Sequence, residues 1–313
     1  MDVRLRRSEL AVPASNPKMI RKAADAGADL VFIDLEDAVA PELKAAARSN
    51  VIEALCSLEW GSTLRCVRIN GVHTRWAVDD LIEVVGAAGQ HLDVVMVPKV
   101  RAPRDIWFVE TMLDHLEGQH HLDRPIGIEV LIEEAEALAQ VEKIAAASPR
   151  LQALILGFGD LSASLGMRAA RLGYPGDVWH YARARMIAAA RAYGVDPIDG
   201  PYGAVKDLEG YRAEAMAAAA MGAVGKWCLN PGQIPIANEV YAPSPAELAD
   251  AVAALDALEA AARSGEGAAM HNGMMIDAAG ARTFEAIVQQ AQACGISADE
   301  ARPDPDPVAG SLR

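Results

Sequence analysis

Residues 30–37 read Leu-Val-Phe-Ile-Asp-Leu-Glu-Asp, and their pattern indicates the fold class. Its apolar residues are continuous rather than alternating, which indicates a strand buried on both faces, as the strands of parallel sheets are. The same texture returns in Val94-Val95-Met96-Val97. Acidic residues follow the first run at once, at the carboxyl end of the predicted strand, where parallel α/β folds bind their ligands.

Comparable apolar runs recur about eight times and alternate with alanine-rich segments of helical length. The other predicted strands are 9–12, 65–69, 93–97, 126–131, 153–156, 195–198 and 223–229. The predicted helices are 18–26, 42–58, 77–88, 103–117, 133–147, 178–193 and 208–221. This alternation predicts an α/β fold, a (β/α)8 TIM barrel, more readily than an open doubly wound sheet. Periodicity alone leaves the open sheet as an alternative, but no glycine-rich nucleotide-binding motif follows the first strand.

After Asn230-Pro231 the strand–helix alternation gives way to long alanine-rich helical segments that are separated by a Ser-Gly-Glu-Gly break. We therefore predict three parts. They are a catalytic barrel over 1–240, a helical lid or oligomerisation subdomain over 241–295, and a disordered, proline-containing acidic tail over 296–313.

Composition excludes several classes of partner. With 43 acidic and 29 basic residues the net charge is -14, which argues against a nucleic acid or an anionic membrane surface. An anionic ligand therefore needs a local basic pocket. The four cysteines form no CxxC pair, which fits a reducing cytoplasm better than a zinc site. No apolar stretch is long enough for a signal peptide or a membrane helix, so we expect a cytoplasmic protein.

Polar residues gather at the carboxyl ends of the predicted strands, where the active sites of TIM barrels lie. They are Asp34, Glu36, Asp37, Arg68, Asn70, Lys99, Glu129, Asp160, Asp199, Lys226 and Asn230.

Two of these carboxylates suggest a metal site. Glu129 interrupts an apolar strand, and Asp160 ends a glycine-containing run on the next strand. A buried carboxylate is costly unless it is paired or bound to a metal. Two carboxylates without histidine or thiolate suit Mg²⁺ or Mn²⁺. The alternative is that each one only pairs with an arginine or lysine of the barrel.

Other charged residues have two interpretations each. Arg68 can hold a substrate carboxylate through two hydrogen bonds, or it can form an ion pair with Glu36 or Asp37. Asp34 and Glu36 share one face of an extended strand, so at least one is expected to support the metal or Arg68, while the others cap the next helix. Lys18 opens the first helix and either binds phosphate there or lies on a solvated face.

At these residues the chain resembles the HpcH/HpaI aldolase and citrate lyase β-subunit family of CoA-ester lyases, most closely the malyl-CoA and β-methylmalyl-CoA lyase branch. The matching stretches are Arg7-Ser8-Glu9-Leu10-Ala11-Val12-Pro13, Asp34-Leu35-Glu36-Asp37-Ala38-Val39, Val67-Arg68-Ile69-Asn70, Pro98-Lys99-Val100, Ile128-Glu129, Gly159-Asp160-Leu161, Ile198-Asp199-Gly200, Gly225-Lys226, Ala237-Asn238-Glu239-Val240 and Ile276-Asp277.

The resemblance implies a TIM barrel in a homotrimer or homohexamer with shared active sites. It implies Glu129 and Asp160 as ligands of Mg²⁺, with Mn²⁺ as a substitute, and Arg68 as the group that orients a 2-oxo acid. Asp277, delivered from the adjacent chain, is implied as the acid/base. The positions expected to contribute further are Glu36 and Asp37 to catalysis, and Arg7, Lys18, Asn70 and Asp199 to substrate binding.

The implied activity is reversible cleavage of L-malyl-CoA or β-methylmalyl-CoA to glyoxylate plus acetyl-CoA or propionyl-CoA. The alternatives are a citramalyl-CoA lyase, another 3-hydroxyacyl-CoA lyase or thioesterase, an aldolase of free hydroxy-oxo acids, and a partner-dependent citrate lyase β subunit. Two departures from the family pattern, at Asn230-Pro231-Gly232 and at Met274, remove positive charge from expected CoA-phosphate contacts.

Overall fold

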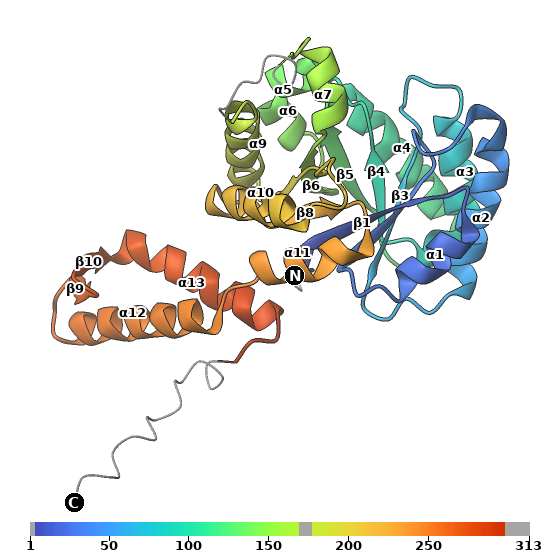
Figure 1. Ribbon diagram of the computed structural model, residues 1–313. Coiled ribbons are helices and arrows are strands. Elements are labelled where there is room, and N and C mark those ends of the chain that lie inside the picture. The colour runs from blue at the N-terminus through green and yellow to red at the C-terminus, as the bar shows by residue number, and fades with distance from the viewer. Residues whose placement is uncertain (1–3, 169–176, 298–313) are drawn as a thin grey trace, which may run out of the picture. The chain divides into compact units, whose positions relative to one another are not determined.

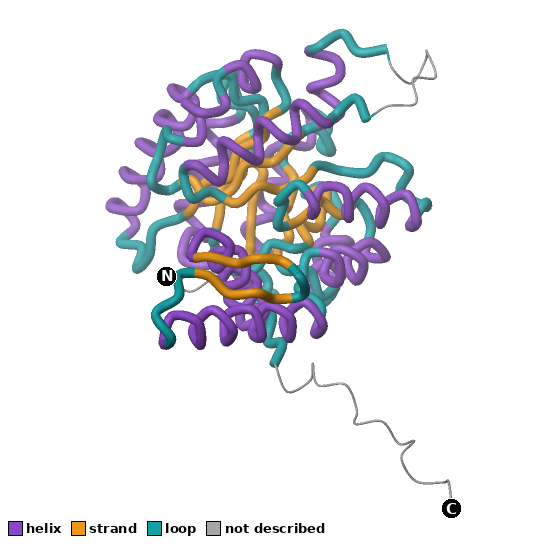
Figure 2. Tube along the Cα trace, turned by 90° about the vertical axis from the view of Figure 1, so that its left-hand side faces the viewer, coloured by secondary structure: helices purple, strands orange, loops and turns teal. Residues whose placement is uncertain are grey.

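A closed barrel of parallel strands forms the centre of residues 6–241, as Figures 1 and 2 show, and confirms the predicted fold class. The computed structural model describes residues 4–168 and 177–297. The strands are paired in sequence order around the barrel, and β1 closes it against β8. They are β1 (Ser8–Pro13), β2 (Leu30–Asp34), β3 (Leu64–Arg68), β4 (Val94–Val97), β5 (Gly127–Ile132), β6 (Leu151–Leu156), β7 (Asp196–Asp199) and β8 (Gly225–Cys228).

Helices surround the barrel and follow its strands (Figure 2). They are α1 (Pro17–Ala24), η1 (Pro41–Leu43), α2 (Lys44–Ser57), α3 (Ala77–Ala88), η2 (Gly89–His91), α4 (Pro103–His120), α5 (Ala135–Ala139), α6 (Val141–Ala145), α7 (Phe158–Ser164), α9 (His180–Ala192), α10 (Leu208–Ala220), η3 (Pro231–Gln233) and α11 (Ile234–Val240).

The core has two layers because each strand is buried on both faces. A large cluster packs between the strands and the outer helices. A smaller cluster fills the barrel itself, and it includes Phe32, Met96, Leu131 and Trp227. This cluster, the barrel filling, separates the amino end of the barrel from its carboxyl end, so side chains at the two ends belong to different sites.

One predicted helix differs in a way that matters for the site. The segment 133–147 was expected to be a single helix, but it forms the short helices α5 and α6, which meet at Gln140. Because α5 begins only at Ala135, Glu133 lies directly after β5 instead of within a helix.

The chain divides into two compact units, one of which is Arg6–Tyr241. The other contains the helices α12 (Pro245–Arg263) and α13 (Ala278–Ala293) with an antiparallel pair of strands, β9 (Ala268–His271) and β10 (Met274–Asp277). From residue 298 onward the predicted tail lies outside the described residues. In the described part of the chain, no helix has the length and apolarity needed to cross a bilayer.

Candidate active site

The carboxyl ends of β2 to β6 bring charged side chains to the mouth of the barrel. Asp34 and Arg68 are the last residues of β2 and β3. Lys99 follows β4, Glu133 follows β5, and Asp160 lies in the first turn of α7 after β6. We call these five residues the mouth cluster.

Arg68 is held at the mouth by a carboxylate and two aromatic rings. Its Nε and Nη2 donate to Asp34 Oδ1 and Oδ2 at 2.7 and 2.6 Å, and Nη1 lies 3.4 Å from Glu36 Oε2. Its guanidinium carbon lies 5.4 Å from the ring centroid of Trp227 and 5.8 Å from that of Phe32. Burial acts to lower the pKa of Arg68, but the charge and hydrogen bonds of Asp34 outweigh it and raise that pKa. Arg68 is therefore a fixed cation whose principal partner is Asp34.

Lys99 links two acidic residues of the loop after β2 to the mouth. Its Nζ lies 2.7 Å from Glu36 Oε1 and 2.9 Å from Asp37 Oδ1. Glu36 is buried, whereas the Asp37 side chain is 57% exposed. Oε2 of Glu36 makes no hydrogen bond within the described residues, although Arg68 is close to it. Both acids are thus engaged by cations of the site.

Glu133 is a carboxyl group whose ionisation the site opposes. It is 2% exposed, and its Oε1 accepts a hydrogen bond from the backbone N–H of Lys99 at 2.7 Å. Burial is the main cause that raises its pKa to about 8, and the charges of Glu36 and Asp160 raise it further. Gly157 makes room for it, because a Cβ at that glycine would lie 2.5 Å from Cβ of Glu133.

Glu133 and Asp160 fit a divalent cation of the Mg²⁺ type. They come from successive strands and offer only carboxylate oxygens, which such hard cations prefer. Within the described residues neither carboxylate pairs with a lysine or arginine side chain. A bound cation would favour the ionised form of Glu133 that burial and neighbouring acids now oppose. No group of three or more His, Cys, Asp or Glu with metal-binding geometry occurs in the described ranges. Because Mg²⁺ is bound by six oxygen ligands, a cation held by two protein carboxylates would keep positions for water and substrate.

The expected metal ligand Glu129 lies elsewhere, and this corrects the sequence-based prediction. Its side chain is fully buried, and its Oε1 accepts a hydrogen bond from Nε of Arg6, which precedes β1 at the amino end of the barrel, at 2.7 Å. Leu131 of the barrel filling separates Glu129 from Glu133 along the strand. Burial is the main cause that raises the pKa of Glu129, while the charge and hydrogen bond of Arg6 act to lower it and the charge of Asp196 adds to the rise. Glu129 is therefore paired with Arg6 at the amino end of the barrel, and Glu133 is the carboxylate of this strand that lies at the mouth.

Arg7 is a second correction. Its Nε and backbone N–H both donate to Oδ2 of Asp29, at 2.8 and 2.9 Å, and Asp29 precedes β2. Both residues thus lie at the amino ends of their strands, opposite the mouth. Arg7 stabilises this end of the barrel and does not reach a ligand at the other.

Two predicted substrate-binding residues have protein partners instead. Asn70 donates from its backbone and side-chain nitrogens to Asp80 Oδ2, at 2.9 and 2.6 Å, and so anchors the loop before α3. Asp199 ends β7 but lies 2.9 Å from Arg183 Nε and 2.6 Å from Lys226 Nζ. These contacts support the loop before α3 and the end of β7, and roles of Asn70 and Asp199 in substrate binding stay predictions.

The remaining predicted residues lie outside the mouth cluster. Lys18 is exposed on α1. Asp277 belongs to the second unit, where its Oδ1 caps α13 by accepting hydrogen bonds from the N–H groups of Ala279 and Gly280 at 2.9 and 3.0 Å. The bonds from Gly280 and Ala279 lower the pKa of Asp277.

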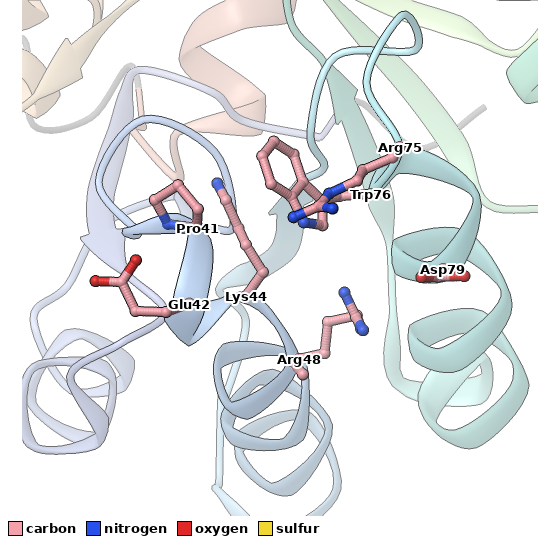
Figure 3. A pocket seen from close by; sticks show the side chains of 8 residues that line it. Pro41, Glu42, Lys44, Arg48, Arg75, Trp76 and Asp79 are labelled. Carbon is pink, nitrogen blue, oxygen red and sulfur yellow. The ribbon is translucent and has the colours of Figure 1, made fainter.

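A pocket of about 340 Å³ opens between the amino ends of α2 and α3 (Figure 3). Lys44 and Arg75 both lie over the Trp76 ring, at 5.3 and 5.0 Å from its centroid. Lys44 donates to the carbonyl oxygens of Leu35 and Glu36, so it ties this pocket to the loop that carries Glu36.

Known proteins are similar to this chain in sequence and in fold. A model of the HpcH/HpaI aldolase/citrate lyase family matches residues 7–231. The chain is 42% identical to the L-malyl-CoA/beta-methylmalyl-CoA lyase of Cereibacter sphaeroides, over 91% of this chain and 94% of that one. It is 37% identical to the malyl-CoA/beta-methylmalyl-CoA/citramalyl-CoA lyase of Chloroflexus aurantiacus, over 89% of this chain and 83% of that one.

Among solved structures, CitE from Mycobacterium tuberculosis in complex with magnesium, acetoacetate and coenzyme A is 33% identical, with a TM-score of 0.71. The match covers 91% of this chain and 97% of CitE. Barrel, charged mouth and sequence together define a carbon–carbon lyase. The chain belongs to the HpcH/HpaI aldolase/citrate lyase family.

Proposed function

We propose that the protein is a Mg²⁺-dependent lyase of 3-hydroxyacyl-CoA thioesters that cleaves L-malyl-CoA or β-methylmalyl-CoA to glyoxylate and acetyl-CoA or propionyl-CoA. The observation that carries this proposal is the buried carboxyl of Glu133, with Asp160 and Arg68 among the charges that act on it. The relatives named as malyl-CoA and β-methylmalyl-CoA lyases support the choice of substrate.

Glu133 and Asp160 are the proposed ligands of Mg²⁺, with Mn²⁺ as a substitute. A bound Mg²⁺ supplies Lewis-acid stabilisation of negative charge on the 2-oxo acid. Arg68 is the cation that orients glyoxylate and stabilises the alkoxide, because Asp34 and two rings already fix its position. Glu36 and Asp37 act indirectly, since both hold Lys99 and Glu36 also borders Arg68.

Asp277 is the proposed acid/base and is supplied by a second copy of the chain. In the synthetic direction it removes a proton from the α carbon of acetyl-CoA or propionyl-CoA, and the resulting enolate attacks the carbonyl carbon of glyoxylate. The alkoxide then takes up the proton that Asp277 removed, which returns Asp277 to its ionised form with no net change in protons. The side chain of Asp277 is exposed here, and transfer into a closed site would raise its pKa toward that of an effective base. The protein is therefore proposed to be a homo-oligomer, a trimer or hexamer, with shared sites.

A substrate panel with purified protein and Mg²⁺ tests the reaction. L-malyl-CoA, β-methylmalyl-CoA and citramalyl-CoA are compared for release of oxo acid, with free CoA thiol measured in parallel. We expect glyoxylate without free thiol. A higher kcat/KM for citramalyl-CoA rejects the substrate choice, and thiol without glyoxylate identifies a thioesterase. Inactivity of the folded protein with every substrate rejects an autonomous lyase.

Mixing two inactive variants tests the shared site. Asp277→Asn lacks the proposed base, and Arg68→Ala lacks the group that orients the oxo acid. If each site combines residues of two copies, mixed oligomers of these variants recover part of the activity. Activity that stays absent after verified subunit exchange rejects the arrangement.

A further inference from the structure

The aromatic rings beneath Arg68 form a stack across the interior of the barrel. Trp227 lies on β8 and Phe32 on β2, and their ring centroids are 4.4 Å apart with an interplanar angle of 37°. The guanidinium of Arg68 lies over both rings. Asp34 fixes two nitrogens of the guanidinium, and the rings support its face. The position of Trp227 therefore bears directly on that of Arg68.

The small side chain of Ala11 fits this stack. In the barrel β1 lies between β8 and β2, so a large residue on its inner face would separate the two rings. Ala11 packs against the same interior cluster. Alternation along a strand places Glu9 on the same inner face as Ala11, nearer the amino end.

Glu9 holds the indole of Trp227 by a hydrogen bond from the amino end of the barrel. It is fully buried, and its Oε2 accepts a hydrogen bond from Nε1 of Trp227 at 3.0 Å. The indole N–H is the only polar group of that side chain, so this bond is its one polar restraint on ring orientation. Glu9 is thus linked through one ring to the guanidinium at the opposite end of the barrel filling.

We propose that Glu9 is a positioning residue for the lyase reaction, which acts through the indole of Trp227 to hold the guanidinium of Arg68 where it meets the 2-oxo acid. This inference rests on the proposed role of Arg68. Glu9 touches no substrate, because it lies at the amino end of the barrel with Arg6 and Glu129 among its charged neighbours.

The surroundings of Glu9 favour an uncharged group as the hydrogen-bond acceptor for the indole of Trp227. Burial is the main cause that raises its pKa well above the ordinary value, and the charge of Glu129 adds to this effect. Oε1 of Glu9 and Oε2 of Glu129 are both buried and make no hydrogen bond within the described residues. A neutral acid at Glu9 can still accept the bond from Trp227, and glutamine reproduces that acceptor.

Three substitutions distinguish loss of the hydrogen bond between Glu9 and Trp227 from a general loss of barrel stability. Glu9→Gln keeps an acceptor for the indole, Glu9→Leu removes it, and Trp227→Phe removes the donor. The controls are Asp196→Asn, which changes another carboxylate near Arg6 without a bond to the indole, and Trp60→Phe, which removes a buried indole N–H bond to Ala54 on the outer side of the barrel.

The first readout is steady-state kinetics in the synthetic direction, with the oxo acid and the acyl-CoA varied separately. We expect Glu9→Leu and Trp227→Phe to lower kcat/KM for glyoxylate by about tenfold, because a small displacement of an orienting group is costly in rate. KM for acyl-CoA should be unchanged. Glu9→Gln and both controls should keep wild-type values, even where their melting temperatures fall.

A double-mutant cycle gives the decisive comparison. In an Arg68→Lys background the planar guanidinium is absent, so adding Glu9→Leu should change kcat/KM by less than about twofold. A full tenfold loss in that background overturns the proposal. Lowered thermal stability of Glu9→Leu with unchanged kinetics also overturns it, since the role is then only structural.

Crystal structures of the wild type and Glu9→Leu decide the inference even if the proposed lyase activity fails. We expect the Trp227 ring to rotate and the Arg68 guanidinium to leave its face in the variant. Unchanged positions of both side chains contradict the inference. A wild type without activity on any malyl thioester rejects the proposed function instead.

Discussion

The backbone nitrogen of Lys99 lies 2.7 Å from Oε1 of Glu133, and Lys99 has a left-handed backbone with φ of 52°. Such a conformation is uncommon for residues other than glycine. It occurs here where one residue directs its N–H to a proposed metal ligand and its ammonium group to Glu36. The strained backbone therefore coincides with a functional demand.

Lys99→Gly and Lys99→Val separate the backbone of Lys99 from its charge. Both remove the ammonium group, but only glycine adopts the left-handed conformation without strain. Urea denaturation should show Lys99→Val to be less stable than Lys99→Gly by about 1 kcal/mol or more. Calorimetric titration should also show weaker Mg²⁺ binding by Lys99→Val. Equal stability and affinity of the two variants would contradict a backbone role.

Glu133→Gln should lose Mg²⁺ affinity but not stability, whereas Glu129→Gln should lose stability but not Mg²⁺ affinity. Glu133→Gln removes an ionisation that occurs only on unfolding near pH 7, so the variant should be more stable than the metal-free wild type at that pH, while Mg²⁺ affinity falls by at least about 100-fold. Glu129→Gln leaves Arg6 without its buried counter-charge and should cost about 3 kcal/mol of unfolding free energy. Its folded form should still bind Mg²⁺. Denaturation and calorimetry on the same preparations measure both quantities, and loss of metal binding by Glu129→Gln would restore the earlier assignment.

Metal binding should release a proton. Since the pKa of Glu133 is raised to about 8, the metal-free protein carries a neutral carboxyl at pH 7 that must ionise to bind Mg²⁺. Titrations in buffers of different ionisation enthalpy should show release of about one proton per ion below pH 8, and less above it. Glu133→Gln should abolish this release. Proton release that is independent of pH would contradict the assignment.

The same group makes the stability of the metal-free protein depend on pH. A carboxyl whose pKa is raised on folding stabilises the folded state most below its unfolded pKa, and this contribution is lost as pH rises through about 8. Glu133→Gln should therefore show a smaller decline in stability between pH 5 and about 8 than the wild type. Urea denaturation across that range, without divalent metal, measures the difference.

Arg68→Lys tests the fixed guanidinium. Lysine keeps the charge but loses the two parallel hydrogen bonds to Asp34 and the planar contact with the rings. We expect kcat/KM for glyoxylate to fall by about 100-fold or more, as for the loss of an oriented transition-state donor. Mg²⁺ affinity should stay close to that of the wild type. Full activity of Arg68→Lys would show that charge alone suffices.

The strands were predictable because continuous apolar runs mark barrel strands by themselves, and Asp34, Arg68 and Asp160 follow from the ends of those runs. The choice between Glu129 and Glu133 was not predictable in this way. Glu129 lies on β5 and Glu133 follows it in the same alternation of faces, so which one reaches the mouth depends on where β5 ends. The helical pattern of 133–147 concealed Glu133, although an acid directly after an apolar run was the available signal. Arg7 was misplaced because a matching motif does not tell which end of a strand it occupies.

Glyoxylate release from L-malyl-CoA by the purified protein, measured before and after chelation of divalent metal, tests whether Glu133 holds a Mg²⁺ ion that the lyase reaction requires. We expect release that stops with the chelator, returns when Mg²⁺ is added, and is absent from Glu133→Gln under all three conditions. Release that persists in the chelator, or full activity of Glu133→Gln, would contradict it.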